Sequence, residues 1–225
     1  MHLPASPKNQ FVLALLVASA VTLSLFTVRW LRNGTAQYSY LVWNLLLAWL
    51  PLLFALWLAR VLRSKLWSSW EALLVSMLWL IFLPNSFYMV SDFIHLKNIG
   101  TVDLLYDAVM FTSFVYLGLT IGFSSLYLVH IKLKQRFNAV VSGSWIGLVL
   151  LLASFAIYLG RDLRWNSWDI LTNPAGLLFD ISDRALQPSG YGQIIVTVFS
   201  FFALLMSMYM VLWSGARFIR KVPQV

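Results

Sequence analysis

Long apolar runs separated by short polar segments dominate this chain. None of the runs carries a charge near its middle. There are six of them, at residues 11–28, 39–59, 67–83, 104–129, 140–159 and 191–213. A helix of about 20 apolar residues crosses the hydrocarbon core of a bilayer. The pattern therefore predicts an all-α fold, a polytopic transmembrane bundle of six spans that forms a single domain over residues 1–225.

Two of the runs need separate consideration. Residues 11–28 exceed the apolar core of about 7 to 15 residues in a signal peptide, and their small residues lie mid-run, so we expect an uncleaved anchor. The third run is the shortest. We expect it to end at Pro84, because proline disfavours helix at the residue before it. Glu71 lies in its first turn, where a carboxylate favours the positive end of the helix dipole.

The composition agrees with a membrane protein. Apolar residues make up 60% of the 225 residues and charged residues 11%, against roughly 45–50% and about 25% in soluble domains. The net charge of +8 comes from residues that flank the apolar runs, which indicates orientation signals and contact with anionic lipid rather than with nucleic acid. The absence of cysteine excludes disulfides and thiolate metal sites.

The basic residues predict an orientation, because cytoplasmic loops carry an excess of Lys and Arg. One set of polar segments holds ten: Lys8, Arg60, Arg63, Lys65, Lys132, Lys134, Arg136, Arg217, Arg220 and Lys221. The opposite set holds six: Arg29, Arg32, Lys97, Arg161, Arg164 and Arg184. Both termini are therefore predicted to be cytoplasmic.

The acidic residues are distributed more unevenly. All but Glu71 belong to the third loop, to the fifth loop or to the first turn of the fourth span: Asp92, Asp103, Asp107, Asp162, Asp169, Asp180 and Asp183. Two crossings separate the third loop from the fifth. The two loops are therefore expected on the same side of the membrane in either orientation.

The third loop contains a candidate acid/base pair. Asp92 and His95 are three residues apart, which places them on one face if the segment is helical. A carboxylate can orient an imidazole and raise its proton affinity, so the pair could work as a hydrogen-bonded dyad. In the alternative interpretation, Ser91 or Asp92 caps a short interfacial helix and His95 faces lipid headgroups.

The same pair could instead offer two ligands to a metal ion. A catalytic zinc needs more protein ligands than this pair provides, and the other histidines, His2 and His130, lie elsewhere. Further ligands would have to be carboxylates such as Asp103, Asp107, Asp162 and Asp169, a set that suits a hard, oxygen-preferring ion. We expect neither a metal nor another cofactor.

The fifth loop concentrates charges and tryptophans. Its segment 157–171 contains Tyr158, Arg161, Asp162, Arg164, Trp165, Asn166, Trp168 and Asp169. The two arginines present planar groups suited to phosphate or carboxylate. One interpretation is recognition of an anionic headgroup or lipid-linked phosphate, and the other is an anchoring girdle of interfacial tryptophans and snorkelling arginines.

Two further patterns concern packing. Asn173 and Pro174 are typical of a helix start, and the following residues predict an amphipathic helix on the membrane surface. Gly118 and Gly122 form a G-x-x-x-G in the fourth span, a pattern that lets membrane helices approach closely.

Two motifs resemble a known family. The first, "LPNSFYMVSDFIHL", runs from Leu83 to Leu96, and Tyr106 and Asp107 follow it; the second, "GRDLRWNSWD", runs from Gly160 to Asp169. Together they are similar to the signature of the bacterial membrane family known as domain of unknown function 1361, over about residues 67–215. The resemblance implies a polytopic protein of the bacterial inner membrane and a shared role for the two motifs, but no activity.

These observations favour a polar site on the outer face, built from the third and fifth loops. Asp92 and His95 would be the acid/base pair, and Arg161 and Arg164 would bind an anion. The supporting residues would be Asn85, Asn166, Asp107 and Asp169. The site would bind or process an anionic lipid or a cell-envelope intermediate. The alternatives are a non-catalytic subunit that binds a protein partner and, less favoured because the span interiors are uncharged, a transporter.

Overall fold

The computed structural model describes residues 7–98, 104–165, 169–186 and 188–221, and all regular structure in these residues is helical. The elements are α1 (Pro7–Asn33), α2 (Ser39–Val61), α3 (Trp70–Tyr88), the 3₁₀ helix η1 (Met89–Asn98), α4 (Leu104–Lys134), α5 (Ala139–Asp162), α6 (Asp169–Thr172), α7 (Pro174–Leu186) and α8 (Pro188–Lys221). Among the described residues, six helical segments are long and apolar enough to cross a membrane. The predicted fold class is confirmed.

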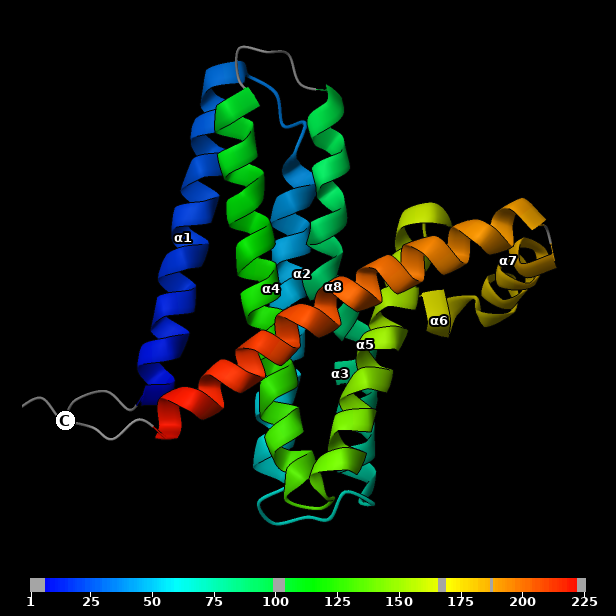
Figure 1. Ribbon diagram of the computed structural model, residues 1–225. Helices are drawn as coiled ribbons and strands as arrows, with labels where there is room; N and C mark the ends of the chain where they lie inside the picture. The colour runs from blue at the N-terminus through cyan, green and yellow to red at the C-terminus, as the bar shows by residue number, and fades with distance from the viewer. Residues whose placement is uncertain (1–6, 99–103, 166–168, 187, 222–225) are drawn as a thin grey trace, which may run out of the picture.

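The helices α1 to α5 run alternately in opposite directions, and α8 crosses them obliquely (Figure 1). The helix α2 packs on α3 and α4, α1 packs on α4, and α5 packs on α3 and α8. The short helices α6 and α7 lie to one side, beyond the C-terminal end of α5 (Figure 1). This arrangement brings η1 and the end of α5 to the same end of the bundle.

The third span does not end at Pro84. The helix α3 includes Pro84 and continues to Tyr88, and η1 extends it further. The prediction was wrong because proline removes one backbone hydrogen bond, which membrane helices tolerate where neighbouring helices and side chains compensate for the freed group. Pro84 is buried in the bundle.

The two glycines of the fourth span pack against the end of α3. A Cβ atom at Gly118 would lie 2.6 Å from the Met89 sulfur and 2.7 Å from the Ser86 carbonyl oxygen. At Gly122 it would lie 2.7 Å from the Phe87 ring. The expectation that this G-x-x-x-G permits close helix packing is confirmed, and its partner is the last turn of α3 together with the start of η1.

A buried ion pair joins α1 to α4. Arg29 donates to both carboxylate oxygens of Asp107, from Nε at 2.6 Å and from Nη2 at 3.1 Å. Arg29 is 8% exposed and Asp107 is fully buried. The Arg29 guanidinium also lies over the Tyr38 ring, 5.6 Å from its centroid. This ion pair joins α1 to α4, and two hydrogen bonds add to it: the Tyr106 hydroxyl donates to the Leu25 carbonyl at 2.8 Å, and the Trp49 indole donates to the Ser19 hydroxyl at 3.3 Å.

The carboxylates collect at one end of the bundle. We call the end where η1 finishes, α4 begins and α5 finishes the acidic end; Asp92, Asp107 and Asp162 lie there. At the opposite, basic end, α2 and α4 finish and α3 and α5 begin. Of the described carboxylates only Glu71 lies at the basic end, where it accepts a hydrogen bond from Lys65.

We expect Gly118→Ala to destabilise the protein by about 1–3 kcal/mol, because the added methyl group overpacks the contact with the Ser86 backbone. The free energy of unfolding in detergent micelles measures this effect. Gly147→Ala on α5 is the matched control, since a Cβ there meets no atom within 4 Å. Alanine favours helix by up to about 1 kcal/mol over glycine, so the control should be neutral or more stable. Equal stability of the two variants would contradict the close contact.

We expect Asp107→Leu to lower the free energy of unfolding by about 3–5 kcal/mol, because it removes the carboxylate that compensates the buried charge of Arg29. The double variant Arg29→Met/Asp107→Leu should recover most of the loss, since it leaves two apolar side chains in place of the pair. Glu71→Gln, which removes one partner of an exposed pair, is the control and should have a much smaller effect. A double variant as unstable as the single one would show that the charge pair is not the cause.

Candidate polar site at the acidic end

The two sequence motifs meet at the acidic end of the bundle. The Arg161 Nη1 atom in the last turn of α5 lies 3.3 Å from the His95 Nε2 atom in η1. Close by, the Asn44 amide of α2 donates to the Asp92 carboxylate at 3.1 Å. The Tyr40 ring lies 5.2 Å from the His95 ring. We call these five residues, which are Tyr40, Asn44, Asp92, His95 and Arg161, the polar cluster.

The 3₁₀ conformation of η1 explains why Asp92 and His95 share a face. Side chains three residues apart eclipse one another in a 3₁₀ helix, so both point toward α2 and α5. The two do not hydrogen-bond to each other; Asp92 pairs with Asn44 and His95 with Arg161. Neither Ser91 nor Asp92 caps a helix, and the Ser91 hydroxyl donates to the Tyr88 carbonyl at 2.7 Å.

Asp92 is the most deeply buried charged group of the cluster. Only 1% of it is exposed, and its hydrogen bond comes from a neutral amide rather than from a cation. The charge of Arg161 attracts it electrostatically without forming a salt bridge. A buried carboxylate held in this way is costly unless a nearby positive charge compensates it. Arg161 therefore interacts with both Asp92 and His95.

Tyr40 and Asn44 belong to the cluster although no sequence motif indicated them. They lie one helical turn apart at the start of α2, a span that otherwise is apolar. The Tyr40 hydroxyl is buried and has no hydrogen-bond partner in the described part of the chain. A polar asparagine within an apolar run was the one available signal, because such residues in membrane helices usually have a partner.

The second motif is held in place by a contact with the first. The Tyr88 hydroxyl of α3 donates to the Gly160 carbonyl at 3.5 Å. A Cβ atom at Gly160 would lie 3.1 Å from the Tyr88 ring. The glycine therefore allows the last turn of α5 to approach α3, which brings Arg161 within reach of His95.

Arg164 has a different environment from Arg161. It is exposed, and its φ of 60° places it in the left-handed region. The Trp165 N–H donates back to the Leu159 carbonyl at 3.1 Å, which closes the end of α5. A left-handed residue commonly follows a helix end, where the orphan carbonyls need donors. Arg164 thus has a backbone role, and the structure does not bring its side chain to the cluster.

The remaining predicted residues are placed as follows. Asn85 donates to the Phe82 carbonyl at 3.1 Å within its own helix. Asp107 pairs with Arg29 rather than with the arginines of the second motif. Asp169 begins α6 and is half-buried. Asn166 lies outside the described residues.

The predicted surface helix lies next to the site. Asn173 Oδ1 accepts from the Gly176 N–H at 3.1 Å and so caps α7, which begins at Pro174 as expected. The Trp165 indole donates to Asp180 at 2.9 Å and ties α7 to the end of α5. Within the described residues, no three carboxylate or imidazole side chains come together as a metal site would require.

Comparison with known proteins places the chain in a family. The family described as "Protein of unknown function (DUF1361)" matches residues 43–208. The chain belongs to this family. The DUF1361 match begins at the second span rather than at residue 67, so it covers Asn44 as well as both motifs. No curated protein and no solved structure matches the chain.

We expect Arg164→Gly to keep or raise the stability of this DUF1361 protein, because glycine adopts the left-handed conformation freely. Arg164→Val should lower the free energy of unfolding by about 1–2 kcal/mol, the cost of that conformation for a side chain with a Cβ. Thermal unfolding in micelles compares the two variants. A lower stability of Arg164→Gly would mean that the guanidinium itself holds the end of α5.

Proposed function

We propose that the polar cluster binds the anionic headgroup of a lipid or of a lipid-linked cell-envelope intermediate. In this proposal Arg161 binds the anion, and Asp92 and His95 act as an acid/base pair on it. The observation that carries the proposal is the contact between Arg161 and His95, which joins the two motifs across separate spans.

The pairing of Arg161 supports an anionic ligand. A guanidinium carries several N–H donors in a planar array that matches phosphate or carboxylate oxygens. In the part of the chain that the structure describes, the hydrogen bond of Arg161 goes to a neutral imidazole nitrogen, and no carboxylate forms a salt bridge with it. Donors therefore remain for a ligand. The buried Tyr40 hydroxyl offers one more donor beside them.

The same contact determines which ring nitrogen of His95 carries the proton. Arginine only donates, so Nε2 of His95 accepts from Arg161 and the ring proton lies on Nδ1. When an anion takes over the Arg161 donor, Nε2 becomes free to accept a proton. Ligand binding and general-base function are thus coupled in the proposed mechanism.

The surroundings of the cluster support a lipid as the ligand. The helix α7 exposes Leu178, Phe179 and Leu186, an apolar face of the kind that lies in a membrane interface. It is tied to α5 by the bond from Trp165 to Asp180. In this proposal the cluster lies near headgroup depth, beside α7. With both termini assigned to the cytoplasm on the charge bias, it faces the outer side.

We expect Arg161→Gln, His95→Gln and Asp92→Asn each to fail to complement a deletion strain and to accumulate the same envelope lipid or lipid-linked glycan as the deletion. Loss of a general base lowers a rate by about 10²-fold to 10⁴-fold, so the His95 variant should be nearly inactive. Lipid extraction and mass spectrometry measure the intermediate. Lys132→Gln, which removes a charge at the basic end, is the control and should complement.

The variants also separate binding from chemistry. A function that depends on Arg161 but survives His95→Gln would indicate a binding protein without acid/base catalysis. Full complementation by all three cluster variants, inserted in the membrane at normal levels, would overturn the proposal. In that case the partner-binding alternative would take its place.

A further inference from the structure

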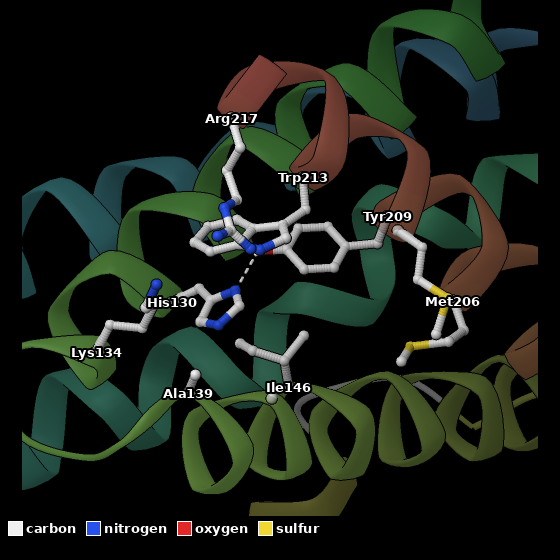
Figure 2. Close-up of a pocket in the computed structure, with 10 residues that line it drawn as sticks. His130, Lys134, Ala139, Ile146, Met206, Tyr209, Trp213 and Arg217 are labelled. Atoms are coloured by element: carbon white, nitrogen blue, oxygen red, sulfur yellow. Dashed lines mark hydrogen bonds between the residues drawn. The ribbon is translucent and has the colours of Figure 1, made fainter. Parts of the chain in front are cut away.

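A second candidate site lies at the basic end, between the end of α4, the start of α5 and the second half of α8. It is a cavity of about 210 Å³. Its walls include Ala139 and Ile146 of α5 and Met206 and Met210 of α8. Figure 2 shows Lys134 and Arg217 toward one end of this cavity and Met206 toward the other. One end is therefore cationic and the other apolar.

One wall of the cavity is held rigid by a buried imidazole. His130 Nδ1 and the Tyr209 hydroxyl are 2.8 Å apart and hydrogen-bonded (Figure 2). The Trp213 ring stacks on His130 with centroids 4.0 Å apart. These contacts join α4 to α8 and keep the cavity open beside them. His130 is thus a structural residue of this site and is far from the cluster around His95.

No carboxylate of the described residues neutralises the charge at the cationic end. The Lys134 ammonium lies 5.3 Å from the centre of the Trp213 ring, and Arg217 is exposed. Of the described carboxylates, only Glu71 lies at the basic end, and it pairs with Lys65. Neither Lys134 nor Arg217 forms a salt bridge within the described residues.

We propose that this cavity is a binding site for an anionic phospholipid, with the phosphate headgroup at Lys134 and Arg217 and an acyl chain against Met206 and Ile146. The two ends of the cavity match the two ends of such a lipid in charge and polarity. Basic pockets between membrane helices at the cytoplasmic side commonly bind phosphate headgroups. The location at helix ends places the cations at headgroup depth and the methionines in the hydrocarbon region.

The site is independent of the polar cluster and serves a different purpose. It bridges α4, α5 and α8, and α8 joins the bundle chiefly through α5. A lipid that fills the cavity adds apolar contact between α8 and the rest of the protein. The proposal therefore makes the docking of α8 dependent on anionic lipid.

Photo-crosslinking in phosphatidylcholine nanodiscs tests the site. The probe is a trace of phosphatidylglycerol that carries a diazirine in one acyl chain, and phosphatidylcholine with the same chain is the comparison. Peptides are then mapped by mass spectrometry. We expect the phosphatidylglycerol probe to label the α8 segment around Met206 and Met210 about tenfold more than the phosphatidylcholine probe, because both basic side chains attract the anionic headgroup.

Three variants distinguish a specific lipid site from general surface charge. Lys134→Gln/Arg217→Gln should reduce the labelling by phosphatidylglycerol about tenfold, whereas Lys132→Gln/Arg136→Gln, with the same change in net charge outside the cavity wall, should leave it within about twofold. Gly143→Leu places a side chain in the cavity with the charges intact. A Cβ at Gly143 meets no atom within 4 Å, so the variant should fold. It too should abolish the preferential labelling.

Three results would overturn the proposal. The first is equal labelling by the two probes, and the second is an equal effect of the two double variants. The third is unchanged labelling in Gly143→Leu, which would show that no acyl chain enters the cavity. None of these results bears on complementation by the variants of the polar cluster.

Discussion

The close packing of α4 against the end of α3 is the contact on which the rest of the acidic end depends. Membrane helices gain little from the hydrophobic effect between them, because lipid tails are as apolar as leucine, so association relies on close van der Waals contact. Gly118 and Gly122 allow that contact with Ser86, Phe87 and Met89. The direction of η1, and therefore the position of Asp92 and His95, follows from it.

A second glycine contact sets the position of the end of α5 relative to α3. Tyr88 emerges from the last turn of α3 and packs on Gly160, which sets how near the end of α5 lies. Arg161 follows directly and meets His95, whereas Arg164 turns away in the left-handed conformation. The two motifs are thus held together by backbone and ring contacts. Of the two arginines, only Arg161 reaches the polar cluster. The polar cluster is a consequence of helix packing rather than of a loop folded on its own.

Three buried polar side chains of the protein differ in the partners that they have. Asp107 is neutralised by Arg29, a bidentate pair that joins two helices. His130 is satisfied by Tyr209 and a stacked tryptophan, which suits a neutral ring. Within the described residues, Asp92 accepts a hydrogen bond from the Asn44 amide and is attracted electrostatically by Arg161, and the Tyr40 hydroxyl has no partner. The first two arrangements are complete, and the third leaves hydrogen-bonding capacity for a ligand. Asp92 and Asp107 are equally buried, so the charged partner of Asp107 distinguishes the structural ion pair from the proposed site.

The sequence by itself determined the six candidate spans and the common side of the two motifs, because apolar length and the number of crossings decide these without any knowledge of packing. It also indicated the cap at Asn173 and the glycine contact in α4, both of which are local or regular patterns. It misplaced the end of α3, since the effect of Pro84 depends on the helices around it. Only the tertiary structure decided that Asp107 pairs with Arg29, that Tyr40 and Asn44 join Asp92 and His95, and that Arg161 rather than Arg164 faces them. Those pairings connect residues on different helices, and the rotation of each helix about its axis, which sets them, is decided by packing against its neighbours.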